Sequence, residues 1–233
     1  MKKFRISLDI TMTILSIILM GGNYLFPADI VHEILGVGLF VLWAVHIILN
    51  HRWYASLAQA SKLITSTNAN DRRSYGAIFK GKYNPYRVMQ TVINSCILIC
   101  TIFLMISGII LSNHIITFLN IQGGLGFARI AHLLASHWYY LFMSLHIGLH
   151  VGRLFQNITA KIIPRIILAL VCAYGIYAFI ARGVWKYLTL RQQFFFFDLD
   201  RGYILFAIDY ISIIILFATL SHLLAKSLKK GKL

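Results

Sequence analysis

Two apolar segments of the chain carry histidines at the same spacing. His32 and His46 are 14 residues apart, and so are His132 and His146. Fourteen residues make about 3.9 helical turns, so each pair lies within about 40° of one helix face and about 21 Å apart along the axis. Ionisable side chains inside apolar segments are costly and usually mark a function. We therefore expect these four imidazoles to act together.

Paired imidazoles at two levels are the axial ligands that two haem b groups need. If one membrane span separates the two histidine-bearing segments, these segments run parallel. His32 then faces His132 near the outer surface, and His46 faces His146 near the inner surface. A b-type haem takes one axial imidazole on each face of its flat ring. The spacing predicts two haems stacked across the membrane, an arrangement suited to transmembrane electron transfer.

Several neighbouring residues are further candidates for this site. His150 lies one turn beyond His146 and is an alternative inner ligand. Glycines between His32 and His46 would leave room for a large flat ring: Gly36 and Gly38. Three arginines lie near the expected depths of the haem propionates: Arg129, Arg52 and Arg153. Snorkelling of long side chains and the positive-inside rule explain the arginines equally well.

Other readings of the histidines remain open. One alternative is that they are scattered structural residues. Another is a single-haem site with His137 and His150 in supporting roles. The third is a haem-free protein. Such a protein would bind or transport a metal ion, or assemble a complex. Zinc and copper sites use closer ligand clusters, often with carboxylates or thiolates. We expect only Glu33 and Asp209 as acids near membrane depth, both toward the outer surface.

The composition is that of an integral membrane protein. The 233 residues are 59% hydrophobic and only 12% charged, and the mean hydropathy is +0.75. A spanning helix needs about 20 mostly apolar residues. Six such segments occur, at residues 7–26, 30–50, 91–119, 130–154, 162–181 and 203–224. The predicted fold class is an all-α membrane protein with six transmembrane helices.

The net charge of +15 follows the predicted topology and does not indicate nucleic-acid binding. With the N-terminus inside, the ends and inner loops carry 17 of the 22 Lys and Arg residues, and the outer loops carry five. This is the asymmetry of the positive-inside rule, so we expect both termini in the cytoplasm and contacts of some basic residues with anionic lipid. The outer loop at residues 182–202, with its run of four phenylalanines, is expected to lie in the membrane interface.

Two units are predicted along the chain. Residues 1–155 form a four-helix haem-binding bundle, and residues 156–233 add two transmembrane helices and a basic tail. The stretch from residue 51 to 87 is expected to be a cytoplasmic loop.

The histidine segments resemble a known family. HEILGVGLFVLWAVHIILNHRWY and RIAHLLASHWYYLFMSLHIGLH contain H-E-x-L-G, V-H-x-x-L-N-x-x-W and S-L-H-x-G-L-H. In this combination they resemble the flavinylation-associated cytochrome domain of bacteria and archaea, which is similar in layout to the cytochrome b subunits of formate dehydrogenases. The resemblance covers roughly residues 8–154. The chain departs from the expected pattern at His51 and His137, where aromatic residues are expected.

The resemblance implies a quinol-linked electron carrier in the cytoplasmic membrane of a prokaryote. It implies two b haems held by His32, His46, His132 and His146, with His150 as the alternative. The electron donor would be menaquinol or ubiquinol, and the acceptor an extracytoplasmic protein bearing covalently attached FMN. No flavin attachment motif is evident in the chain, so the flavin would belong to that partner. Asn50, His51 and Glu33 are polar candidates for a quinone site.

Overall fold

The computed structural model describes residues 2–25, 28–52, 55, 85–119, 121, 123–197 and 202–230. Within these ranges all regular elements are helices, which confirms the predicted all-α class for this part of the chain. The long helices are α1 (Lys2–Met20), α2 (Asp29–Leu49), α5 (Pro85–Leu111), α6 (Leu125–His150), α8 (Ile162–Ala181) and α10 (Gly202–Lys230). The short ones are α7 (Gly152–Ala160), α9 (Val184–Leu188), and the 3₁₀ turns η1 (Gly22–Leu25) and η2 (Thr117–Leu119).

Each predicted segment overlaps one long helix, but several of the predicted ends differ from those observed. The first segment was expected over residues 7–26, whereas α1 runs from Lys2 to Met20. The third segment was expected to run to residue 119, whereas α5 ends at Leu111. The fourth was expected to run to residue 154, whereas α6 ends at His150 and a separate helix, α7, follows Val151. Most of the expected loop at residues 51–87 lies outside the described residues.

Four of the described helices are long and apolar enough to cross a membrane: α2, α5, α8 and α10. Their outward faces expose many large apolar side chains, for example Ile204, which is 80% exposed, and Ile163, which is 68% exposed. Apolar surface of this extent is typical of a lipid-facing protein. The helices therefore have the character of a membrane protein.

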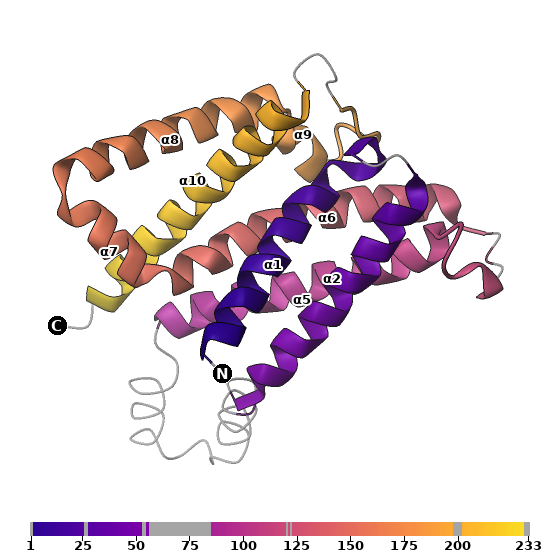
Figure 1. Cartoon of the computed structure of the whole chain (residues 1–233), viewed down its shortest axis with the longest axis horizontal. Helices are drawn as coiled ribbons and strands as arrows, with labels where there is room; N and C mark the ends of the chain where they lie inside the picture. The colour runs from indigo at the N-terminus through magenta and orange to yellow at the C-terminus, as the bar shows by residue number, and fades with distance from the viewer. Residues whose placement is uncertain are drawn as a thin grey trace, which may run out of the picture.

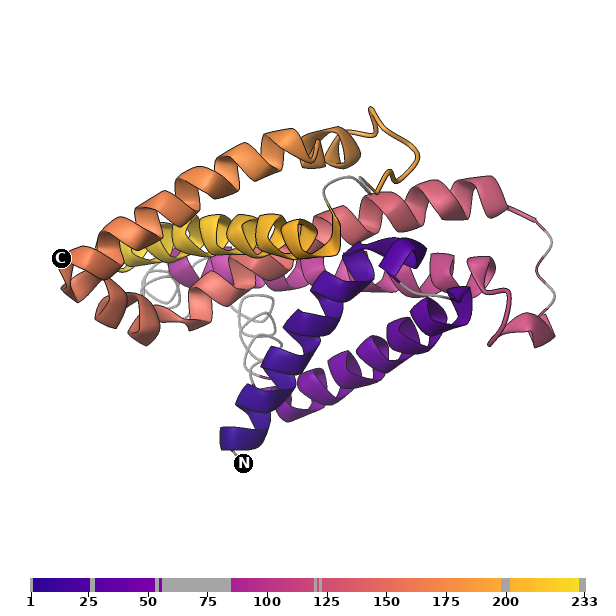
Figure 2. The ribbon, with the colours of Figure 1, turned by 45° about the horizontal axis from the view of Figure 1, so that its top comes forward.

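Helix α6 occupies the centre of the bundle. Figure 1 shows it between α5 on one side and α10 on the other, with α8 beyond α10. Figure 2 shows α1 and α2 as a hairpin that leans against this set of helices. The most buried side chains of α6 include polar ones: His137, Tyr140 and Ser144. The arrangement places polar groups inside and apolar groups outside, as expected for helices in hydrocarbon.

Two glycines allow α10 to pack closely on its neighbours. A side chain at Gly148 of α6 would overlap the carbonyl of Ala218. A Cβ added at Gly175 of α8 would lie 2.6 Å from the carbonyl oxygen of Ser212. Small residues at helix crossings are a common means of close packing in membranes. The division into units 1–155 and 156–233 stays a prediction, and α10 of the second range packs along α6 of the first.

A buried ion pair joins α8 to α10. The Arg182 Nε donates to Asp209 Oδ2 at 2.7 Å, and the Tyr174 hydroxyl donates to Asp209 Oδ1 at 2.5 Å. The side chains of Arg182 and Asp209 are only 8% and 2% exposed. Charges at this burial persist only when they are paired. The pair therefore fixes the C-terminal end of α8 against α10.

The outer aromatic loop folds back onto the bundle. Phe195 and Phe197 pack into the core, whereas Phe194 and Phe196 are 61% and 72% exposed. The Tyr187 hydroxyl accepts the Phe196 N–H at 3.2 Å, which holds the loop against α9. Two of the four phenylalanines thus pack on the bundle. The position in the membrane interface that is expected for the loop remains a prediction for the two exposed ones, Phe194 and Phe196.

We expect Arg182→Met to destabilise the protein by about 3–5 kcal/mol, because it leaves Asp209 buried without its charged partner. Thermal unfolding in detergent measures the loss. The double variant Arg182→Met/Asp209→Leu should recover most of it, since no uncompensated charge remains. A double variant as unstable as the single one would contradict this role of the ion pair.

Candidate functional site

The structure brings the four predicted histidines together as two facing pairs. The ring centroids of His32 and His132 are 6.4 Å apart, at an interplanar angle of 61°. Those of His46 and His146 are also 6.4 Å apart, at 73°. One member of each pair comes from α2 and the other from α6. The chain therefore repeats one imidazole pair at two levels of the same helix pair. After the predicted topology, we name His32 and His132 the outer pair and His46 and His146 the inner pair.

The two histidine-bearing helices are held apart. Helix α2 packs chiefly against α1 and α5, and none of its residues is fully buried. A cavity of about 650 Å³ lies beside the outer pair, and His32 and His132 are both in its wall. Its wall comes from α1, α2, α5, α6 and the outer aromatic loop. This volume is in the range of cofactor-sized sites.

The partners of His132 assign its tautomer. The Ser107 hydroxyl donates its hydrogen to the Phe103 carbonyl at 2.6 Å, so the same oxygen acts as acceptor for His132 Nδ1–H at 3.0 Å. Nε2 of His132 then carries the lone pair. Gly108, the next residue on α5, has His132 Cε1 within 3.8 Å of where a Cβ would be. Ser107 therefore orients the ring while Gly108 leaves it space.

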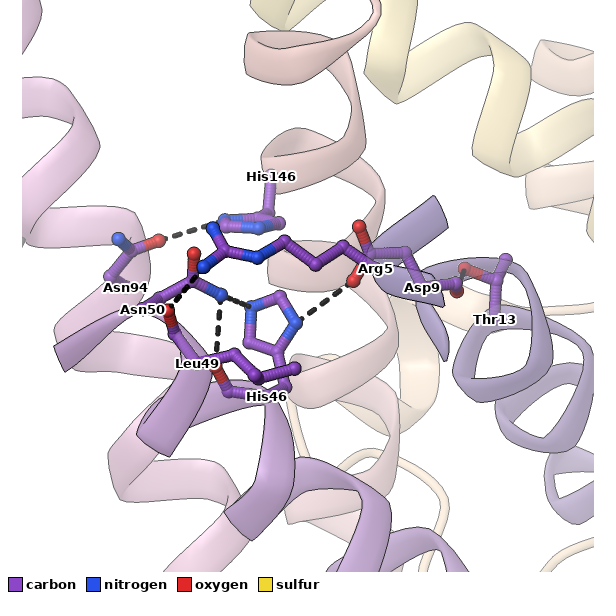
Figure 3. Close-up of polar contacts among 8 residues, drawn as sticks. All are labelled: Arg5, Asp9, Thr13, His46, Leu49, Asn50, Asn94 and His146. Atoms are coloured by element: carbon purple, nitrogen blue, oxygen red, sulfur yellow. Dashed lines mark hydrogen bonds and ion pairs between the residues drawn. The ribbon is translucent and has the colours of Figure 1, made fainter. Parts of the chain in front are cut away.

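At the inner level, His46 is held from two sides (Figure 3). Its Nδ1 lies 2.9 Å from the Asp9 carboxylate, which can only accept, so Nδ1 carries the proton. Its Nε2 lies 3.3 Å from the Asn50 amide nitrogen, which also donates to the His46 carbonyl at 2.8 Å. A long contact of this kind is weak. The Nε2 lone pair of His46 is thus engaged by a weak hydrogen bond from Asn50, which a ligand can displace at low cost.

His146 is oriented in the same way by a different helix. Its Nδ1 lies 2.8 Å from Asn94 Oδ1 on α5, as Figure 3 shows. An amide oxygen accepts, so Nδ1 is the donor and Nε2 carries the lone pair. His132, His46 and His146 therefore share one tautomer, with the proton on Nδ1.

The residues present fit axial ligation of haem iron. An imidazole nitrogen lies about 2 Å from a metal ion, and the ring centre about 1 Å further back, so two rings on opposite sides of one ion have centroids about 6 Å apart. Both pairs meet this separation. Metal-binding histidines usually donate their other ring N–H to a nearby acceptor. Ser107, Asp9 and Asn94 are such acceptors.

Some of the other predicted site residues lie at the site, and the rest lie outside it. Arg129 and Gly36 line the outer cavity, whereas Gly38 is not among its lining residues and has open space beside it. The His150 ring is 4.5 Å from that of His146 and on the same helix. Arg52 is exposed at the end of the described segment, and the side chain of Arg153 lies outside the described part. The ligand roles themselves stay predictions.

Glu33, one of the candidates for a quinone site, lines the outer cavity and forms a latch between α2 and α5. Its carboxylate accepts from the Ser112 hydroxyl and the backbone N–H groups of Asn113, His114 and Ile115, and from the His114 ring at 3.1 Å. These groups follow the last residue of α5, and Glu33 supplies their acceptor from another helix. The latch ties His32 to the end of α5.

Sequence reasoning missed four contributors: Asp9, Asn94, Ser107 and Gly108. Asp9 was not among the acids expected near membrane depth, and it contacts His46. A single acid within an apolar helix was the available signal. Nothing in the spacing of Asn94, Ser107 and Gly108 indicated contact with α6, since that contact depends on how α5 packs on α6.

The remaining histidines lie outside the two pairs. His137 is 1% exposed, donates from Nδ1 to the Leu133 carbonyl and stacks on Tyr187 with centroids 4.3 Å apart. His51 is exposed and contacts the Ile48 carbonyl. His222 stacks on Phe155. Of these three histidines, His137 is the one that lines the outer cavity.

Among the described residues, no three His, Cys, Asp or Glu side chains converge as a metal-binding group. Pairs of imidazoles are the arrangement that axial haem ligation uses. Comparison with protein-family models, curated proteins and solved structures finds no match to the chain. Its function is therefore inferred from the geometry of the site.

We expect Gly108→Leu to reduce the haem content of the purified protein by about half, because the larger side chain would displace His132 and fill space beside the outer pair. Gly108→Ala is the matched control. Its Cβ would lie at ordinary contact distance from the ring, so haem content should stay unchanged. Equal haem content in both variants would show that this space is not used.

Proposed function

We propose that the protein is a membrane cytochrome b that binds two haem b groups and transfers electrons across the membrane. The observation that carries the proposal is the repeated imidazole pair, with the same 6.4 Å separation at two levels. A single close pair of histidines is an ordinary packing contact. Two pairs with equal separation, on the same two helices and with most ring N–H groups engaged, favour two equivalent axial sites.

Haem iron would supply one-electron redox chemistry at each level. The chain's own residues would hold it: His32 and His132 at the outer site, His46 and His146 at the inner site. Ser107, Asp9 and Asn94 keep the Nε2 lone pairs of their histidines available. Arg129, in the wall of the outer cavity, would meet an anionic propionate there.

We propose six spans with both termini in the cytoplasm. The four apolar helices support this, and so do α1 and α6, which pack alongside them. In Figure 1 the start of α1, the start of α5 and the end of α10 lie toward one end of the bundle. Basic residues of the described chain gather there, for example Lys3, Arg87 and Lys229. This agrees with the positive-inside rule.

The donor and acceptor in this proposal rest on the family resemblance. Electrons enter from menaquinol or ubiquinol and leave outward, past the His32–His132 pair, to an extracytoplasmic FMN-bearing protein. Asn50 and His51, which follow His46 on the inner side, and Glu33, next to His32, remain the candidates for quinol contacts. The membrane is then the cytoplasmic membrane of a prokaryote.

The reduced-minus-oxidised optical spectrum of the purified protein, with haem quantified per chain, tests the proposal. Two b-type haems per chain are expected. One haem would favour a single site with His150 in a supporting role. A colourless protein would overturn the proposal, and metal-dependent stability would then support a haem-free metal protein.

We expect His46→Ala to remove the inner haem and retain the outer one, lowering the haem content from two per chain to one. The outer ligands lie on other turns of the same helices and keep their own partner in Ser107. His132→Ala should give the complementary spectrum. If His46→Ala kept both haems while His150→Ala lost one, His150 would be the inner ligand and the assignment to this pair would be wrong.

A further inference from the structure

The two imidazole pairs differ in the group that holds their ligands. At the inner level, His46 Nδ1–H donates to the Asp9 carboxylate at 2.9 Å. At the outer level, His132 Nδ1–H is held by the neutral Ser107 hydroxyl at 3.0 Å. The third ring, that of His146, has the neutral amide oxygen of Asn94. Among these three oriented imidazoles, only His46 has a charged partner.

The cation nearest to Asp9 along α1 makes its hydrogen bond to another group. Arg5, one turn earlier, donates its Nη2 to the Leu49 carbonyl at 2.9 Å and thereby caps the end of α2, as Figure 3 shows. The ion pair that Asp9 makes is the one with His46. His46 is itself only 25% exposed in its side chain, which limits screening by water at the ring.

Acids at the outer level are placed differently. Glu33 is adjacent to His32, but its carboxylate accepts five hydrogen bonds from residues 112–115. Asp29 lies in the cavity wall one turn before His32, and the cation Arg129 lies in the same wall. The carboxylate of Glu33 is therefore held by hydrogen bonds of the α5 latch, whereas that of Asp9 accepts directly from the ring of His46.

We propose that Asp9 is a positioning residue that lowers the reduction potential of the inner haem. The inference rests on the proposed function. A carboxylate that accepts the ring N–H makes the imidazole a stronger electron donor, and second-shell hydrogen bonding of this kind is a main lever on haem potential. The added negative charge favours the oxidised iron over the reduced one. A lower inner potential favours electron flow from the inner to the outer site.

A potentiometric titration of the haem spectra in Asp9→Asn tests the proposal. The inner component is identified as the one missing from His46→Ala. Its midpoint potential should rise in Asp9→Asn, while that of the outer component stays within error. Asp9→Glu keeps the charge and should restore the inner midpoint toward the wild-type value. The titrations use protein reconstituted with excess haem, so that weaker binding does not prevent the measurement.

Asp29→Asn is the matched control, because it removes one carboxylate from the other end of α2. It should leave the inner midpoint unchanged. Equal shifts of both haems in Asp9→Asn would reveal a general surface-charge effect and overturn the proposal. An unchanged inner midpoint would do the same, as would failure of the variant to hold an inner haem after reconstitution, which would make Asp9 a purely structural residue. Wild-type protein without haem would instead refute the proposed function.

Discussion

Imidazoles in an apolar bundle must have partners, and this constraint organises the molecule around α6. That helix carries four histidines, His132, His137, His146 and His150, together with serines and tyrosines. Hydrocarbon offers these groups no hydrogen bonds. They are instead enclosed by α5 and α10 and supplied with acceptors such as Ser107, Asn94 and the Leu133 carbonyl. Much of the bundle's buried polarity thus lies on α6, and the Arg182–Asp209 ion pair adds a second polar contact between α8 and α10.

The two sides of α6 are packed differently. On the α8–α10 side, glycines and a buried ion pair bring helices into close contact. On the α1–α2 side, α2 stands away from α6, and a cavity adjoins the outer imidazole pair. The tightly packed side gives α6 a fixed position. The open side lets the rings of α2 face those of α6 across a gap, which direct helix packing would have closed.

The sequence predicted the elements and the facing pairs well because both follow from local periodicity. An apolar segment of about 20 residues indicates a helix, and a shared 14-residue spacing puts both pairs at common levels on parallel helices. It predicted the ends of α5 and α6 poorly, because those depend on capping. Glu33 collects the backbone N–H groups after Leu111, a contact across 79 to 82 residues that no local pattern shows.

The groups that orient the imidazoles were also beyond local reasoning, since Asp9, Asn94 and Ser107 come from α1 and α5. Their chemistry nevertheless follows one rule, in which each ring is held through Nδ1 and the lone pair is left on Nε2. The rule is met by a hydroxyl, an amide and a carboxylate, which differ in charge but not in geometry. Two sites built to one separation can therefore differ in electronic character without any change in the ligands. In the proposed electron carrier, such a difference would add a preference for one direction to the one that donor and acceptor set.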